Sequence, residues 1–212
     1  MSLFSFFGFG KNKKAPEKAN TPAPAIEVLP GFDADVIATL GAFSKLPLQK
    51  LPAIDSEDSC TIPGAFFNGY LALMTGKDDI NGKALKLKQL YNGTQYRFFV
   101  FDGDDNSSGI GLILGSELDI LRYRLTNAYN YDLSPDDVLA KIEDLDARLG
   151  VSIVGCGMDW IELRFDRLPA DMDAFADEMY AFCPDSVDQG VGDIASLKQA
   201  IADMHGMYFW WD

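Results

Sequence analysis

The amino-acid sequence predicts an α+β protein in which helices cover a mainly antiparallel sheet in two layers. The first observation is size, because 212 residues with 48% hydrophobic content can bury the core of one large domain or two small ones. The second is that apolar residues at helical spacing alternate along the chain with short strand-like runs. The third is the order of elements after residue 134, which reads helix, strand, strand, helix, helix, strand.

The first 25 residues are expected to be a flexible leader and linker, because residues 10–25 are rich in Lys, Ala, Pro and Asn. Residues 1–9 are rich in phenylalanine but lack the preceding basic residues and the following cleavage site of a signal peptide. This stretch could rest weakly on an anionic membrane, and an unordered leader is the preferred interpretation. We expect an N-terminal α+β region over residues 26–118 and a C-terminal α+β domain over residues 119–212.

Two helices and a hairpin are expected in the N-terminal region. Apolar stripes at helical spacing follow Asp33 and begin again at residue 80. The stripes are Val36, Ile37, Leu40 and Phe43, then Ile80, Ala84, Leu87 and Tyr91. Between them, Pro47, Pro52 and Pro63 predict loops and edge segments. Residues 96–101 and 110–114 predict a hairpin whose solvated turn lacks the glycine and glutamate of a calcium-binding loop.

Residues 117–128 fit two structures. Leu118, Leu121, Leu125 and Ala128 suit a helix, whereas residues 121–125 also alternate as a strand does, and the helix is preferred. The next helix is clearly marked, since Ser134 is a good N-cap, Pro135 suits the first helical position and Gly150 follows the last turn.

The C-terminal unit continues with two strands, residues 151–155 and 159–165, which a three-residue link makes an antiparallel hairpin. In the second strand, Trp160, Glu162 and Arg164 share one face. A helix follows, striped by Met172, Phe175, Met179 and Phe182. The last helix is capped by Asp193 and closed by Gly206, and a strand over residues 207–211 ends the unit.

Composition excludes several classes of function. The formal net charge of −14 repels phosphate backbones, so we expect no nucleic-acid partner and favour a basic protein partner. No stretch approaches the ~20 apolar residues of a transmembrane helix, so stable membrane insertion is not expected. Three widely separated cysteines argue against disulfides and zinc and favour a reducing cytoplasm. With His205 as the single histidine, we expect neither a multi-histidine metal centre nor a cofactor.

From about residue 119 to residue 212, the chain resembles an uncharacterised, largely bacterial domain-of-unknown-function family, number four-two-five-three. The segments that carry the resemblance are Thr126-Asn127, Asn130-Tyr131-Asp132, Gly155, the stretch 159–163, Phe182-Cys183-Pro184-Asp185, the stretch 187–192 and Trp210-Trp211-Asp212. Where the family tends to place a glycine, this chain has Ala128, which disfavours a left-handed turn. The resemblance implies no activity, and it adds Asn130 and Tyr131 to the candidate binding residues.

The candidate site lies around the Cys183-Pro184 turn. Pro184 ends helical geometry, and the polar loop that follows leads to the helix N-terminus at Asp193. The candidate binding residues there are Cys183, Asp185, Asp188, Gln189 and Gly190, joined by Trp210, Trp211 and Asp212 if the last strand folds back beside this loop. The carboxylates could bind a ligand or could simply accept hydrogen bonds from the loop backbone. For Cys183, buried packing is preferred over a nucleophile paired with His205.

Trp210 and Trp211 are expected on opposite faces of the last strand. The outward ring could anchor a partner or form the floor of a pocket, or a helix from the N-terminal half could cover it.

Three functions fit the sequence. The preferred one is a non-catalytic acidic binding protein, with an antitoxin-like or immunity-like inhibitor as one form, which holds a basic protein partner. The alternative is a metal-assisted hydrolase built on Asp185, Asp188 and Asp212. The third is a scaffold domain without a small ligand. The oligomeric state is left open by the sequence.

Overall fold

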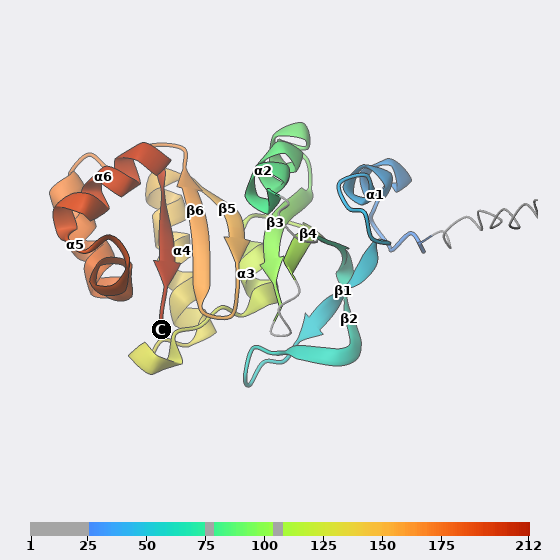
Figure 1. Cartoon of the computed structure of the whole chain (residues 1–212), viewed down its shortest axis with the longest axis horizontal. Helices are drawn as coiled ribbons and strands as arrows, with labels where there is room; N and C mark the ends of the chain where they lie inside the picture. Colours follow the sequence, from blue (N-terminus) through green and yellow to red (C-terminus); the bar gives the residue numbers. More distant parts are fainter. Residues whose placement is uncertain (1–25, 75–78, 104–107) are drawn as a thin grey trace, which may run out of the picture.

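The computed structural model describes residues 26–74, 79–103 and 108–212. Within these residues, seven strands form one sheet in the order β1-β2-β4-β3-β5-β6-β7 (Figure 1). The strands are β1 (Gln49–Ile54), β2 (Thr61–Leu73), β3 (Tyr96–Asp102), β4 (Ser108–Leu114), β5 (Val151–Cys156), β6 (Trp160–Phe165) and β7 (Gly206–Trp210). The predicted leader and residues 104–106 of the predicted solvated turn lie outside the described residues.

The helices form where capping and apolar spacing predict them. They are α1 (Ala34–Gly41), α2 (Ile80–Leu90), α3 (Leu118–Arg124), α4 (Pro135–Leu149), α5 (Met172–Phe182) and α6 (Ile194–Met204). At α4, the Ser134 side chain accepts from the Asp137 backbone, and the Asp137 side chain accepts from the Ser134 backbone, forming a capping box. Asp193 likewise caps α6 by accepting from the backbone N–H of Ser196. The structure confirms the α+β class, and it confirms the preferred helix within residues 117–128 for Leu118–Arg124, after which Leu125 is left-handed.

Six strand contacts make the sheet, and five of them are antiparallel. The exception is the pairing of β3 with β5, which is parallel and aligns Val100 with Gly155 and Phe101 with Cys156. This pairing joins the strands of the N-terminal half to those of the C-terminal half in one continuous sheet.

Helices cover both faces of the sheet. Successive side chains of a strand point to opposite faces, so a single strand contributes to both cores. In β3, Phe98 and Val100 belong to the core under α1 and α2, with Ile37 and Leu87. Phe99 and Phe101 belong to the larger core on the other face, which contains the buried sides of α3 to α6. Figure 1 shows α4 behind the sheet and α5 and α6 beside β7.

Two parts of the fold differ from the expectation. The predicted loops around Pro52 and Pro63 are largely strand, since β1 and the 13-residue β2 form a hairpin. Pro52 is tolerated because β1 is an edge strand. The outer end of β2, with Pro63, pairs only with β1, whereas β4 pairs with residues 70–73.

The end of α6 also differs, because His205 rather than a glycine takes the left-handed conformation there, with φ of 46°. Gly206 instead begins β7, and its missing Cβ would lie 2.0 Å from the Leu163 carbonyl oxygen. Glycine is therefore needed here for close strand approach, not for the cap. Ala128 has a negative φ of −141°, so it does not adopt the left-handed conformation that a glycine at this position would favour.

Candidate functional site

The polar turn after α5 and the residues after β7 lie side by side. The predicted loop is a short π-helical segment, η2 (Ser186–Val191), which begins directly after the Cys183-Pro184 turn. Ser186 Oγ donates to the Tyr208 carbonyl at 3.2 Å, and the Trp211 indole donates to the Phe182 carbonyl at 3.3 Å. The two stretches therefore form one locale, as the fold-back of the last strand requires.

Asp185 is the centre of this locale and is 4% exposed. One of its oxygens accepts from Gln189 Nε2 at 2.9 Å and the other from the backbone N–H of Asp212 at 3.0 Å. The Tyr131 hydroxyl also donates to it, and Asn130 Nδ2 donates to the Asp212 carbonyl. Burial alone would raise the pKa of Asp185, but these hydrogen bonds outweigh it and hold the pKa below its usual range. We call Asn130, Tyr131, Asp185, Gln189 and Asp212 the aspartate clasp.

Cys183 lies fully buried beneath the clasp. Its Sγ donates to the Trp210 carbonyl at 3.2 Å and lies 3.1 Å from Ser186 Oγ. Burial raises the pKa of the Cys183 thiol, the opposite of what activates a nucleophile. His205, the candidate base, is an exposed residue at the end of α6. The preferred interpretation of Cys183 as buried packing fits these contacts.

The two terminal tryptophans have different environments. Trp211 is 1% exposed and packs against Phe182 and Phe209, at centroid distances of 5.4 and 5.7 Å. Trp210 is half-buried and lines a cavity together with residues of η2 and α6. Trp211 lies one residue beyond β7, so strand alternation alone does not set its direction.

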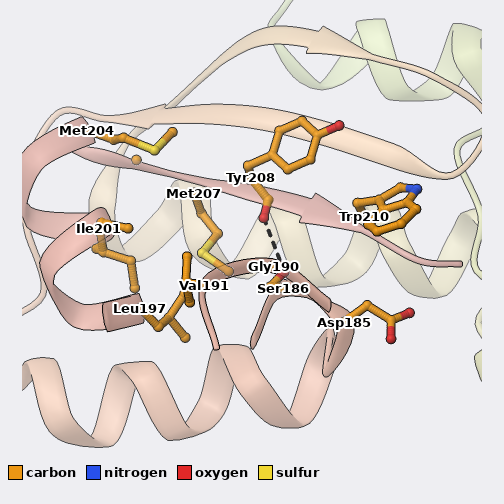
Figure 2. A pocket seen from close by; sticks show the side chains of 12 residues that line it. Asp185, Ser186, Gly190, Val191, Leu197, Ile201, Met204, Met207, Tyr208 and Trp210 are labelled. Carbon is orange, nitrogen blue, oxygen red and sulfur yellow. Dashed lines mark hydrogen bonds between the residues drawn. The ribbon is translucent and has the colours of Figure 1, made fainter. Parts of the chain in front are cut away.

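The cavity beside Trp210 has a volume of about 150 Å³ and lies along β7 between η2 and α6 (Figure 2). Its floor is apolar and includes Leu197, Ile201, Met204 and Met207. The rest of the lining comprises Asp185, Ser186, Gly190, Val191, Ala200, Gly206, Tyr208 and Trp210. A cavity of this volume accommodates a benzene-sized group, comparable with one large apolar side chain. We call it the edge cavity, because β7 is an edge strand of the sheet.

The free edge of β7 is partly blocked. The backbone of Phe165 donates to the His205 carbonyl and that of Trp211 donates to Asp159, so the odd-numbered residues of β7 face β6. Tyr208 and Trp210 therefore direct their backbone groups away from β6, and their carbonyls already accept from Ser186 and Cys183. These side-chain donors occupy acceptors that an incoming strand would need.

A second cavity, of about 260 Å³, lies where α2 meets β3, β6 and β7. Its lining includes Asn81, Asp102, Trp160, Glu162 and Tyr208. The Trp160 and Tyr208 rings stack at 5.8 Å with an interplanar angle of 23°. We call it the acidic–aromatic pocket, and Tyr208 lines both it and the edge cavity.

The structure does not gather every candidate residue in one cavity. Among them, only Asp185, Gly190 and Trp210 line the edge cavity. Asp188 is exposed and accepts from the Tyr180 hydroxyl at 3.2 Å. Within the described ranges, no group of three or more His, Cys, Asp or Glu residues could hold a metal ion. Both oxygens of Asp185 are engaged by protein donors, so the arrangement resembles a structural tie more than an open ligand set.

A comparison with protein families finds a match for the half of the chain that contains these contacts. Residues 111–212 match the model of the domain of unknown function DUF4253. The resemblance expected from the sequence is therefore confirmed, and the DUF4253 match begins inside β4, earlier than residue 119. Neither the curated proteins nor the solved structures contain a match to this chain.

The DUF4253 region contains the aspartate clasp and the edge cavity, whereas the acidic–aromatic pocket also uses Asn81 and Asp102, which precede the match. Sequence reasoning missed Tyr208, Met207 and Leu197 as cavity residues. The available signal was the last strand itself, because consecutive aromatic residues, Tyr208 to Trp211, place large side chains on both faces of the strand. The part of the chain that the structure describes contains no helix long and apolar enough to span a membrane.

Proposed function

We propose that the protein is a non-catalytic binding protein that engages a basic protein partner at the edge cavity. The observation that carries this proposal is the lining of that cavity, which joins an apolar floor of Leu197, Ile201 and Met207 to the carboxylate of Asp185. Asp188 in η2 and Asp203 in α6 are both exposed. Neither forms a salt bridge within the described residues. The partner inserts one apolar side chain and places basic residues over these acids.

Side-chain insertion fits this edge better than strand addition. The outward carbonyls of Tyr208 and Trp210 already have donors, whereas the adjoining cavity leaves room for a side chain against its apolar lining. Met204 and Met207 are unbranched and polarisable, so the floor can adapt to more than one shape of side chain. An antitoxin-like or immunity-like inhibitor is one form of this function, since the net charge of −14 suits a basic target.

We extend the proposal to a cytoplasmic protein, supported by Cys156 and Cys183, which are buried and form no disulfide.

The experiment uses the full chain and three blocked pentapeptides. The first has a central leucine between two lysine-arginine pairs, the second replaces leucine by serine, and the third replaces the basic residues by acidic ones. Trp210 fluorescence reports binding, with Trp160→Phe and Trp211→Phe substitutions to assign the signal. We expect the basic leucine peptide to bind about tenfold or more tightly than the serine peptide, and the acidic peptide not to bind.

Two matched variants locate the binding. Ala200 lines the edge cavity, so Ala200→Phe fills it and is expected to abolish binding of the leucine peptide. Ala195 is an exposed residue of the same helix outside the lining, so Ala195→Phe is expected to bind like the native chain. Equal binding of acidic and basic peptides, unchanged binding by Ala200→Phe, or no binding of the basic leucine peptide would each contradict the proposal.

A further inference from the structure

The acidic–aromatic pocket is built from segments far apart in the chain. Asn81 comes from α2, Asp102 from the end of β3, Glu162 from β6 and Tyr208 from β7. Glu162 lies directly opposite Tyr208 in the β6–β7 pair, so both side chains project from the same face of the sheet. The cavity is therefore a consequence of the sheet order rather than of any local motif.

The aromatic wall of this pocket is held in place. Trp160 Nε1 donates to Asp102 Oδ2 at 3.3 Å, and a Cβ added at Gly157 would lie 2.1 Å from the same nitrogen. Gly157 thus leaves the room that the indole occupies. Tyr208 stacks on Trp160 yet is 45% exposed, so its ring remains accessible to a ligand. A rigid, accessible aromatic surface binds a cation at little cost in conformational entropy.

The charged groups that face this wall are mostly acidic. Glu162 Oε1 pairs with Arg164 at 2.7 Å, and Glu162 Oε2 accepts from Asn81 at 2.8 Å. The Asp102 carboxylate accepts from Ser108 and Trp160, and no basic side chain in the described residues forms a salt bridge with it. Arg124 donates to the backbone carbonyl of Asp102, at 3.4 Å, and not to its carboxylate.

The negative potential extends to the aromatic wall. Burial raises the pKa of Tyr208, and the nearby carboxylates of Asp159, Glu162 and Asp102 raise it further. Asp159 itself has its pKa raised by burial and by Asp102 and Asp212, although Arg124 opposes the shift. Three carboxylates therefore face the region of Tyr208 against two guanidinium groups.

We propose that the acidic–aromatic pocket binds the guanidinium group of an arginine side chain presented by a protein partner. A planar guanidinium can stack on the Trp160–Tyr208 wall while its N–H groups donate to Asp102 and Glu162, whose oxygens each have one protein donor and a second lone pair that can accept. The compact lysine ammonium cannot make this combination. This inference deepens the proposed function, since the arginine belongs to the basic partner. Because Tyr208 lines both cavities, one partner segment can fill them with an arginine and a nearby apolar side chain.

The test uses the full chain labelled with ¹⁵N and follows the indole N–H signals, with the Trp160 signal assigned by Trp160→Phe. The probes are N-acetyl-arginine methylamide, the lysine and citrulline analogues with the same blocking groups, and free arginine. Citrulline has nearly the shape of arginine without its charge. We expect the Trp160 signal to shift with the blocked arginine at a Kd of about 1–10 mM. The blocked lysine and citrulline analogues should bind at least about fivefold more weakly than blocked arginine. Free arginine should do the same, because its own carboxylate is repelled by the acidic pocket.

Two tyrosines provide matched variants. Tyr208→Ala removes half of the wall and should abolish the shift, whereas Tyr129→Ala removes a tyrosine of similar exposure, 50%, outside the pocket and should leave it unchanged. Glu162→Gln keeps the shape of the side chain and should weaken binding severalfold, and a preserved amide spectrum shows that each variant is folded. A Trp160 signal that ignores arginine, an equal response to citrulline, or an intact response in Tyr208→Ala overturns the inference.

The two proposals fail separately. Suppose that the native chain binds the leucine peptide and the Ala200→Phe variant does not bind it, while blocked arginine leaves the Trp160 signal unshifted. In that case only the guanidinium site is disproved. If blocked arginine shifts Trp160 but the leucine peptide fails to bind, only the edge-cavity function is lost.

Discussion

The backbone N–H of Asp212 donates a 3.0 Å hydrogen bond to the side chain of Asp185, 27 residues earlier. Replacing Asp185 by alanine would leave this donor, Gln189 Nε2 and the Tyr131 hydroxyl without their shared acceptor. We expect Asp185→Ala to lower the free energy of unfolding by about 2–3 kcal/mol in urea titrations. Asp188→Ala removes an exposed carboxylate of the same turn and should change stability little. Equal effects of the two substitutions would show that the clasp does not stabilise the fold.

The same carboxylate predicts a dependence of stability on pH. The folded pKa of Asp185 lies below its unfolded value, so its stabilisation is complete above the unfolded pKa, near 4, and is lost as the pH falls through the folded pKa. The difference in unfolding free energy between the native chain and Asp185→Asn should therefore shrink between about pH 6 and about pH 2.5. Urea titrations across that range measure it, and a constant difference would contradict the assignment.

Tyr131 should titrate far above an ordinary tyrosine. Its hydrogen bond to Asp185, together with burial, raises the pKa of Tyr131 to about 12. We expect Asp185→Asn to lower the pKa of Tyr131, as followed by NMR of ¹³C-labelled tyrosine. Tyr180 is the matched control, because the hydrogen bond to Asp188 is the main cause that raises its pKa. Asp185→Asn should leave Tyr180 unaffected, whereas Asp188→Asn should lower its pKa.

The three cysteines should differ in reactivity. Burial raises the pKa of the Cys156 thiol to about 12 and also raises that of Cys183, and both residues are 0% exposed. Cys60 is only partly buried. A maleimide added to the folded protein should therefore label Cys60 first, as read by peptide mass spectrometry. Early labelling of Cys183 would contradict this prediction and favour the alternative hypothesis that Cys183 is a nucleophile.

Gly206 should be intolerant of any side chain. A Cβ there would lie 2.0 Å from the backbone oxygen of Leu163, and a backbone atom cannot move aside without breaking the β6–β7 pairing. We expect Gly206→Ala to cost about 2–3 kcal/mol in unfolding free energy. Gly41, at the end of α1, has open space where its Cβ would lie, so Gly41→Ala should stabilise by about 0.5 kcal/mol. Thermal unfolding of both variants distinguishes the two effects.

Most of the fold could be predicted because its signals are local. Ser134, Pro135 and Gly150 define α4 from neighbouring residues alone, and the hairpin of β5 and β6 follows from a link too short for anything else. The hairpin of β1 and β2 was missed because Pro52 and Pro63 are tolerated only where a strand has an unpaired side, which depends on the sheet order. The prediction that Gly206 closes α6 was wrong because a left-handed histidine, as at His205, has no clear local signal.

The candidate site also has one part that the sequence predicted and one part that it could not predict. The approach of Asp212 to Asp185 was anticipated, since the aromatic residues of the last strand had to pack against something. The acidic–aromatic pocket could not be predicted, because Asp102 and Trp160 meet only through the order of β3, β5, β6 and β7. Their hydrogen bond spans 58 positions of the sequence.

The parallel contact between β3 and β5 has a practical consequence for anyone who isolates the DUF4253 region. A fragment starting at residue 111 would retain β5 but lose β3, so the backbone of Gly155 and Cys156 would lose its β3 neighbour along a newly exposed strand. Phe99 and Phe101 would leave the larger core with it, uncovering the packing surfaces of Tyr123. Such a fragment should self-associate through its exposed strand edge, so we expect the stable folding unit to begin upstream of residue 111, where the family match begins.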